Sequence, residues 1–553
     1  MTGANFRTLK GDIYGGITAA VVALPLALAF GVASGAGAIA GLYGAIAVGF
    51  FAAIFGGTPA QVSGPTGPMT VVMGAIVAQY ADRLSEAFAI VVLGGALQIL
   101  FGVLRLGRYV SYTPYSVVSG FMSGIGVIII LIQTLPFFGL PTAPGGPIGA
   151  IQAWPSIPGK LNFDAVIIAA VALALMIFWP KRLHAILPPP LAALVIGTLL
   201  GVFALTGAPV IGEVPTGLPQ FIIPVFDPAN IPSIVQAALI LALLGSIDSL
   251  LTSLVADSIT RTRHDSNREL VGQGIGNMIA GLIGGLPGAG ATMRTVVNVR
   301  AGGRTPVSGA LHAVILLALV LGLGPLAEQV PHAALAGILL KVGWDIIDWG
   351  YLRRIARAPR DKVAVMLVTL GLTVFVDLIT AVAVGIIMAS FVTARWQEEH
   401  QIRGITTLAL PNGDGKGLLS KQEEELLAKA NGNIAVVMMR GAFSYASARE
   451  MERVIANEAA GRMAVVYDFS DAAYMDTSAA LSFEELFHRA SEEGALCFVC
   501  GLSGQARKTL EGLGILAAIP KDQLFDKRTD AVAAAVKAIQ DKNARADEPG
   551  RKS

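Results

Sequence analysis

Two pieces of segment 242–304 decide the fold: Gly245-Ser-Ile-Asp-Ser-Leu-Leu-Thr252 and Leu286-Pro-Gly-Ala-Gly-Ala-Thr-Met-Arg-Thr295. The first lies in an apolar run, so its carboxylate, Asp248, is expected at membrane depth, where a charge costs at least ~2.5–3.5 kcal/mol. That cost is tolerable where the side chain faces a polar cavity, a cation or a proton. Thr252 follows four residues later and therefore lies on the same helix face.

The second piece predicts a break in a membrane helix. Pro287 and the glycines around it exclude a helix interior at 285–292. Non-helical backbone at membrane depth persists only where it is buried in protein or lines a cavity. A carboxylate and a broken helix close together in sequence therefore predict an ion and substrate site.

The composition is that of an integral membrane protein. Of 553 residues, 54% are hydrophobic and only 14% are charged, against roughly 25% charged in soluble domains. The net charge of +2 points to no partner class, and we expect no nucleic acid. We see no catalytic constellation or nucleotide loop, so we expect a protein that is not an enzyme and needs no cofactor beyond a coupling ion.

Apolar runs of about 20 residues, or fewer for half-helices, predict fourteen spans. The ranges are 13–34, 38–56, 66–80, 86–104, 113–138, 163–179, 187–206, 233–256, 268–284, 291–299, 306–324, 332–346, 362–377 and 379–395. With the N-terminus inside, the outer loops hold only Arg83 and Lys160, whereas the inner loops are rich in arginine. This asymmetry follows the positive-inside rule and predicts that both termini are cytoplasmic.

The third and tenth spans begin alike, and they lie seven spans apart. One starts Ser63-Gly-Pro-Thr-Gly-Pro68 and the other Pro287-Gly-Ala-Gly-Ala-Thr292. Seven spans per repeat invert the second half, which is typical of inverted repeats with discontinuous helices near the midplane. Two half-helix N-termini would then converge, and their free N–H groups and partial positive charge favour an anion.

The composition changes after Arg395. We expect a transmembrane transport domain at 1–396, a connector at 397–409, a soluble α/β domain at 410–540 and a disordered polar tail at 541–553. Strand-like runs alternate with helical segments in the α/β domain. Cys497 and Cys500 have CxxC spacing, but their flanks are strand-like and residues three apart on a strand face opposite sides, which favours a buried strand over a metal or redox site.

Four stretches of the chain resemble the SulP anion permeases, the sulfate permease and prestin superfamily, and within it the sodium-dependent bicarbonate transporters. They are Gly11-Asp-Ile-Tyr-Gly-Gly-Ile-Thr-Ala-Ala20, Pro65-Thr-Gly-Pro-Met-Thr-Val-Val72, Ile247-Asp-Ser-Leu-Leu-Thr-Ser-Leu-Val-Ala-Asp257 and Pro287-Gly-Ala-Gly-Ala-Thr-Met-Arg-Thr-Val-Val-Asn298. The resemblance implies a UraA-like core-and-gate fold of seven plus seven spans. It also implies a C-terminal STAS domain, elevator-type alternating access and a homodimer in the inner (plasma) membrane.

The resemblance also implies a sodium site. Asp248 and Thr252 would bind the ion together with backbone or hydroxyl oxygens of Gly290, Ala291 and Thr292. Hard oxygen ligands suit a hard cation. The alternative for Asp248 is a structural acid bonded to backbone at a helix break.

For the anion, the resemblance implies contacts with Thr66 and with the N-terminus of the tenth span at Ala291 and Thr292. The alternative is that these residues only cap their half-helices, although capping and anion binding use the same N–H groups. Arg294 would add positive potential to the anion site, or it would snorkel to the inner interface.

One regulatory site is expected in the C-terminal domain. Asp476-Thr-Ser478 resembles the phosphorylation motif of bacterial anti-sigma-factor antagonists, with Ser478 as the acceptor, although Ala479 stands where that motif usually has glycine. The alternative is an ordinary strand-to-helix turn with Ser or Thr as the N-cap.

These features predict a secondary active transporter that takes up bicarbonate with sodium. Within the same class, the alternative is a proton-coupled sulfate or dicarboxylate permease. From another class, the alternative is a membrane anion sensor that signals through the STAS domain.

Overall fold

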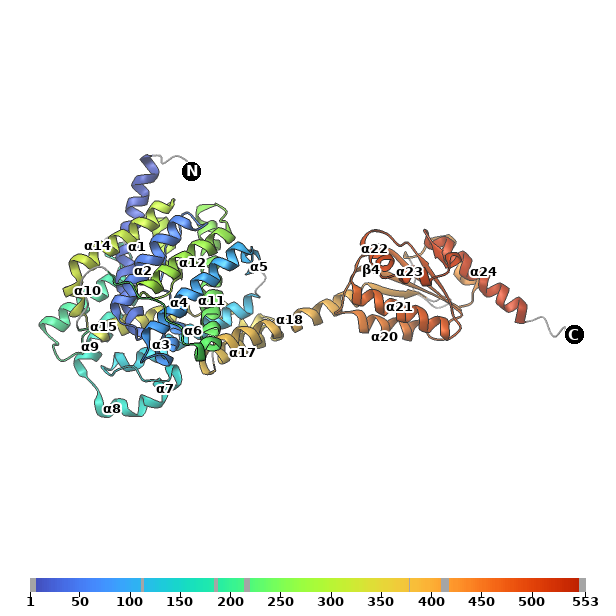
Figure 1. Ribbon diagram of the computed structural model, residues 1–553. Coiled ribbons are helices and arrows are strands. Elements are labelled where there is room, and N and C mark those ends of the chain that lie inside the picture. Colours follow the sequence, from blue (N-terminus) through green and yellow to red (C-terminus); the bar gives the residue numbers. More distant parts are fainter. Residues whose placement is uncertain are drawn as a thin grey trace. The chain divides into compact units, whose positions relative to one another are not determined.

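The computed structural model describes residues 6–110, 114–183, 187–212, 219–376, 378–408 and 417–546. The chain divides into two compact units, Met1–Ala389 and Ser390–Ser553, which are coloured from blue to yellow and from yellow to red in Figure 1.

Helices build the first unit, and one helix lies in each of the fourteen ranges expected to span. These helices are α1 (Phe6–Ala33), α2 (Ala38–Phe55), α3 (Gly67–Gln79), α4 (Leu84–Val103), α6 (Tyr115–Phe137), α9 (Phe163–Phe178), α10 (Pro189–Phe203), α11 (Ile231–Thr260), α12 (Ser266–Leu282), α13 (Thr292–Arg300), α14 (Pro306–Glu328), α15 (His332–Ile346), α17 (Arg360–Phe375) and α18 (Leu378–Ile402). Short helices connect some of them: α5 (Gly107–Val110), α7 (Gly146–Ala153), α8 (Ile157–Lys160) and α16 (Trp349–Leu352). Within the described residues, 6 helices are long and apolar enough to cross a membrane by themselves.

Two short strands interrupt this helical unit at the predicted breaks. Strand β1 (Ser63–Gly64) precedes α3, and strand β2 (Ala289–Gly290) precedes α13. They pair antiparallel, with Ser63 opposite Gly290 and Gly64 opposite Ala289. The pairing therefore places the starts of α3 and α13 side by side.

Small residues let the helices around this pairing approach closely. On α12, a Cβ built at Gly272 would lie 2.3 Å from the Gly56 nitrogen, and one at Gly274 would lie 2.6 Å from the Gly95 carbonyl oxygen. Such contacts are typical of membrane helices, where small residues allow backbones to pack tightly. Helix α12 is thereby held between α2 and α4.

The second unit is an α/β domain, as predicted. Its sheet has the order β3-β4-β5-β6-β7, and its strands are parallel except for the β3–β4 pair. The strands are β3 (Ile405–Leu408), β4 (Ile434–Phe443), β5 (Ala464–Met475), β6 (Leu496–Cys500) and β7 (Leu524–Phe525). The helices are α19 (Lys421–Lys429), α20 (Ala448–Ala459), α21 (Thr477–Glu492), α22 (Gly504–Gly512), α23 (Ile515–Ala518) and α24 (Arg528–Ala546).

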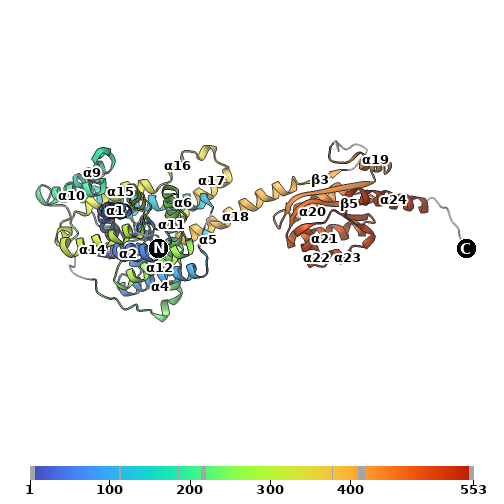
Figure 2. The ribbon, with the colours of Figure 1, turned by 90° about the horizontal axis from the view of Figure 1, so that it is seen from above.

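Helices cover both faces of this sheet. Helices α20 to α23 pack on one face, through residues such as Ile455 and Phe483, while α19 and α24 pack on the other, through residues such as Leu427 and Val532 (Figure 2). Cys497 belongs to the first core and Cys500 to the second. Both thiols are free and buried, which confirms the buried strand.

The sheet begins earlier, and the last helix ends later, than we expected. Strand β3 lies inside the expected connector, 397–409, and the boundary at 410 stays a prediction. Helix α24 continues to Ala546, so residues 541–546 of the expected disordered tail are helical. Good helix formers such as Lys542 and Ala544 extend the helix beyond its packed part. Residues 547–553 lie outside the described residues.

Candidate functional site

Asp248 and Thr66 meet in the middle of the first unit. Asp248 lies on α11, and its residue is 7% exposed. Its Oδ2 accepts a hydrogen bond of 2.8 Å from Thr66 Oγ1. Thr66 occupies the N-cap position of α3, yet its side chain makes no cap hydrogen bond. The threonine hydroxyl therefore joins the start of α3 to the α11 carboxylate.

Thr252, one turn after Asp248, joins the same face of α11 to the start of α13. Its Oγ1 donates to the Gly290 carbonyl oxygen at 2.9 Å and lies 2.7 Å from Thr292 Oγ1. Two hydroxyls and one carbonyl are thus gathered one turn from a carboxylate. Oxygen atoms of this kind are the ligands that hard cations prefer. No cluster of three or more His, Cys, Asp or Glu that could hold a metal occurs among the described residues.

The N–H of Ala291 is not free for an anion, contrary to our expectation. It donates to the Val62 carbonyl at 2.9 Å, and the Ala291 carbonyl accepts from the Thr295 N–H at 2.9 Å. The cause is the β1–β2 pairing, which continues one residue beyond the strands. The first-turn N–H groups of α13, from Thr292 onward, have no acceptor within their own helix.

Arg294 is buried, with 2% of the residue exposed, so it does not snorkel to an interface. Its Nη2 donates to the Pro65 carbonyl, directly before Thr66. Its Nη1 is enclosed and has no hydrogen-bond partner among the described residues. A Cβ built at Gly64 would lie 2.7 Å from this nitrogen, so β1 lies against the guanidinium. The arginine charge therefore lies beside the start of α3.

A polar stripe on α12 supports the two breaks, and our sequence reasoning missed it. The Glu269 carboxylate accepts bonds of 2.8 Å from the Gln61 and Gln273 side-chain amides and bonds of 2.9 Å from two backbone N–H groups just before β1. Asn277 holds the Gly288 backbone through bonds of 2.7 and 3.0 Å. Glu269, Gln273 and Asn277 recur every four residues, and this spacing was the signal available in the sequence.

In the C-terminal unit, Ser478 is exposed and is the second residue of α21. The N-cap is Asp476, whose carboxylate accepts from the Ala479 N–H at 2.9 Å. The cap is therefore an aspartate and not the Ser or Thr that we considered. Modification of Ser478 stays a prediction.

Two protein families match long segments of the chain. The Sulfate permease family matches residues 9–370, and the STAS domain matches residues 425–531. This chain belongs to the sulfate permease family. As a sulfate permease family member with several apolar helices, it is a multi-pass membrane transporter that carries a STAS domain.

Some relatives of this sulfate permease family member are named bicarbonate transporters, and others are named sulfate transporters. The chain is 43% identical over 544 residues to the Bicarbonate transporter BicA of Synechocystis sp., which covers 97% of this chain and 96% of that protein. It is 31% identical to the Putative sulfate transporter YvdB of Bacillus subtilis, over 95% of this chain and 97% of that one.

Solved structures share its fold. The transmembrane domain of a cyanobacterial bicarbonate transporter BicA matches with a TM-score of 0.64 and 50% identity, over 68% of this chain and 98% of that chain. The SLC26A9 structure matches with a TM-score of 0.79 over 97% of this chain and 91% of that chain. Its identity of 18% shows the fold alone.

Proposed function

We propose that this protein is a secondary active transporter that takes up bicarbonate together with sodium. The observation that carries the proposal is the Asp248–Thr66 hydrogen bond of 2.8 Å. This bond places a carboxylate, which suits a cation, directly at a half-helix N-terminus, which suits an anion. The BicA relatives, which bear the name bicarbonate transporter, support this choice of substrate.

Sodium and the anion would bind next to each other and help each other. Asp248, Thr252, Thr292 and the carbonyl oxygens of Gly290 and Ala291 are the proposed sodium ligands. An ionised Asp248 without a cation repels an anion at Thr66, because like charges a few ångströms apart cost several kcal/mol at moderate dielectric. Bound sodium cancels this repulsion, and such a coupling is reciprocal.

The anion would rest between the starts of α3 and α13. Its proposed contacts are the Thr66 hydroxyl and Thr292, with Arg294 contributing positive potential from behind β1. Ala291 stays a proposed neighbour of the anion, although its N–H donates to the Val62 carbonyl oxygen. Thr66 now donates to Asp248, and a cation on that carboxylate would release the hydroxyl for the anion.

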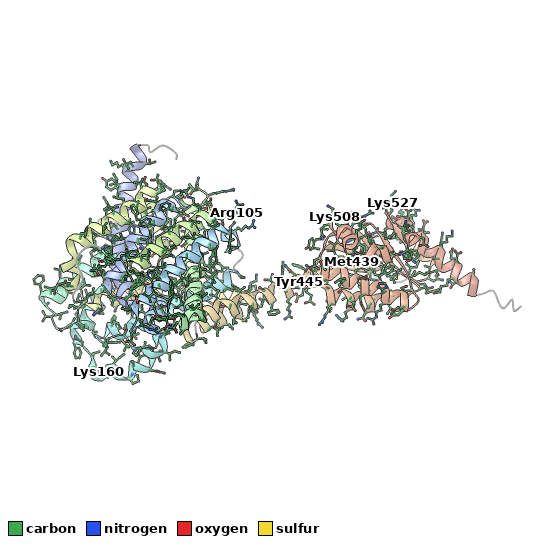
Figure 3. All side chains as sticks on the ribbon, in the orientation of Figure 1. Arg105, Lys160, Met439, Tyr445, Lys508 and Lys527 are labelled. Carbon is green, nitrogen blue, oxygen red and sulfur yellow. The ribbon has the colours of Figure 1, made fainter. Side chains whose placement is uncertain are left out.

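We propose that the fourteen helices all span, with both termini in the cytoplasm of the cell whose inner (plasma) membrane holds the protein. Figure 3 places Arg105, from an expected inner loop, toward the end where α1 begins, and Lys160, from an expected outer loop, at the opposite end. This separation agrees with the positive-inside rule.

An elevator mechanism with a UraA-like core and gate fits the packing of the helices. Helices α2, α4, α11 and α12 pack on one another, whereas α6 packs on α15 and α17, and α15 packs on α9. In our proposal the first group carries the site as a core, and the second is the gate against which it moves. A homodimer would anchor the gates, and the STAS domain would regulate the protein through Ser478 or serve in assembly.

Uptake by purified protein in proteoliposomes tests this function. Labelled bicarbonate, sulfate and fumarate are offered with and without an inward sodium gradient and, separately, a proton gradient. We expect bicarbonate uptake that requires sodium. Sulfate or fumarate uptake driven by protons would instead support the permease that the YvdB relative suggests, and anion binding without flux would support a sensor.

A further inference from the structure

A small cavity lies between α1, α3, α6 and α15, apart from the site at Asp248. Its volume for the centres of water-sized molecules is about 30 Å³, whereas one water needs roughly 10–15 Å³. Phe30, Val71 and Leu339 contribute apolar walls, and Thr70 and Gln133 are the polar side chains that line it. The cavity therefore has room for about two waters or for a small anion without its hydration shell.

Gln133 presents the amide that lines this cavity. The residue is 4% exposed, and nothing in the described part of the chain hydrogen-bonds to its amide. The Thr70 hydroxyl, by contrast, already donates to the Thr66 carbonyl at 2.7 Å. The amide lines the cavity and is not among the fully enclosed atoms, so a ligand in the cavity can pair with both its N–H and its carbonyl.

The cavity adjoins the start of α3, where we place the anion. Ile129 lines the cavity and also covers Gly67. A Cβ built at Gly67 would lie 2.9 Å from Ile129 Cδ1 and 2.8 Å from Ile346 Cδ1. Gln133 follows Ile129 by one turn of α6. Ile129 of α6 therefore contacts both the start of α3 and the cavity that holds the Gln133 amide.

We propose that this cavity is a second anion position, at which Gln133 selects a planar, protonated oxyanion. The inference rests on the proposed bicarbonate function. A primary amide presents N–H donors beside a carbonyl acceptor. Bicarbonate presents an anionic oxygen beside an O–H, so the two groups can pair through two hydrogen bonds.

Nitrate is the informative competitor because it is planar and singly charged like bicarbonate but has no O–H. Against nitrate, the Gln133 carbonyl would face an oxygen of the anion, and a site built for a hydroxyl rejects an analogue that lacks one. Gln133 would thus discriminate bicarbonate from other anions of equal charge. Half-helix N-termini discriminate such anions less well.

The test uses the full chain in proteoliposomes with sodium-driven uptake of labelled bicarbonate and nitrate as inhibitor. Gln133→Met keeps the length of the side chain and removes the amide, while Gln236→Met makes the same change at an exposed position of α11. We expect Gln133→Met to lower the ratio of the nitrate inhibition constant to the bicarbonate KM about three- to ten-fold. Gln236→Met should leave this ratio unchanged.

An unchanged ratio in a monodisperse Gln133→Met protein overturns the inference and leaves the proposed function intact. Absence of sodium-driven bicarbonate uptake by the wild-type chain overturns both. If Gln133→Met does not yield folded protein, Gln133→Asn replaces it, since it keeps the amide but withdraws it by one methylene. That variant should lose part of the preference over nitrate, and a full preference overturns the inference.

Discussion

At the scale of single residues, the hydrogen bond between Thr66 and Asp248 joins the two proposed ligand sites. Thr66 is on the anion side, at the start of α3, and Asp248 is on the sodium side, on α11. Its 2.8 Å length leaves no room for an intervening water. A change on either side chain therefore affects the ligand of the other.

Asp248→Asn should reduce sodium-driven uptake to background, because a neutral amide cannot compensate the charge of a cation at membrane depth. The measurement is the initial rate of labelled bicarbonate uptake against sodium concentration. Ser258→Ala, at the exposed end of the same helix, is the control and should keep the wild-type rate. Sodium-driven uptake that persists in a folded Asp248→Asn protein would remove Asp248 from the sodium site.

Thr66→Val should weaken anion binding more than sodium binding, by about three- to ten-fold, because it removes one hydrogen bond while keeping the shape of the side chain. The affinities are measured by calorimetric titration of each ligand. Thr198→Val on α10 is the matched control, since that hydroxyl donates to the Leu194 carbonyl of its own helix. Equal weakening of both ligands would show that Thr66 holds the fold and not the anion.

At the scale of elements, the β1–β2 pair positions the starts of α3 and α13. It brings Thr66 and Thr292 together from opposite halves of the first unit, and Asn277 fixes Gly288 next to it. Gly288 must be a glycine for a steric reason, since a Cβ there would lie 2.4 Å from the Gly64 carbonyl carbon. The atoms that this Cβ would meet belong to the Gly64 backbone, which cannot move aside as a flexible side chain could.

Gly288→Ala should therefore separate the two strands and abolish sodium and anion binding together. The measurements are both titrations and the thermal midpoint of the purified protein, which should fall. Gly371→Ala, on α17, is the control because a Cβ there meets nothing within 4 Å and alanine favours the helix. Normal binding in Gly288→Ala would contradict the role given to this strand pair.

At the scale of the whole molecule, a buried ionic cluster adds to the two apolar cores of the C-terminal unit. Arg528 at the start of α24 lies 3.0 Å from both Glu423 and Asp468, whose side chains are 3% and 5% exposed. Burial raises the pKa of Glu423, but hydrogen bonds from Arg528 and from the Ser420 N–H outweigh it and bring the pKa from 4.5 down to about 2. The ionised carboxylate therefore stabilises the folded unit.

Glu423→Gln should destabilise this unit by about 1–3 kcal/mol at pH 7, because Arg528 loses a buried charged partner. Cys497 and Cys500 are the only cysteines of the chain, and burial raises the pKa of the Cys497 thiol to about 12. Thiol labelling in urea therefore reports unfolding of this unit in the full chain. The partly exposed Glu450, which pairs with the exposed Arg453, gives the control, since Glu450→Gln should leave the labelling midpoint unchanged.

The same cluster sets a pH dependence. The folded-state pKa of Glu423 lies below its unfolded value, so its stabilisation is complete above about pH 4.5 and disappears as the pH falls toward 2. The difference in thermal midpoint between the wild-type chain and Glu423→Gln should therefore shrink from pH 5 to pH 3, as followed by circular dichroism. A constant difference would mean that Glu423 acts through its shape alone.

Much of this architecture is predictable from the sequence because it depends on local information. Apolar runs mark the helices, and Pro65 and Pro287 with their glycines mark the two breaks. The α/β character of the C-terminal unit follows from its alternating strand-like and helical runs. The CxxC pair is correctly placed on opposite faces of a strand because the strand repeat alone decides it.

The remaining features depend on contacts between residues far apart in the chain. Arg294 reaches the Pro65 carbonyl across 229 residues, and the Ala291 N–H is taken by Val62. No local sequence pattern predicts that Arg294 bonds to Pro65 or that Ala291 bonds to Val62. Both contacts form only when the two halves of the unit fold onto each other. The α12 stripe was visible as a spacing of four, but the N–H groups before β1 that donate to Glu269 were not.

In our proposal sodium and the anion share one site around Asp248 and Thr66, and calorimetry on the full-length protein measures the coupling between them. The dissociation constant of bicarbonate is measured without sodium and at saturating sodium, and that of sodium without and with bicarbonate. We expect each ligand to tighten the binding of the other by the same factor, about 5- to 150-fold, and Asp248→Asn to remove this effect. A bicarbonate affinity that is equal in sodium-free and sodium-saturated protein would contradict the shared site.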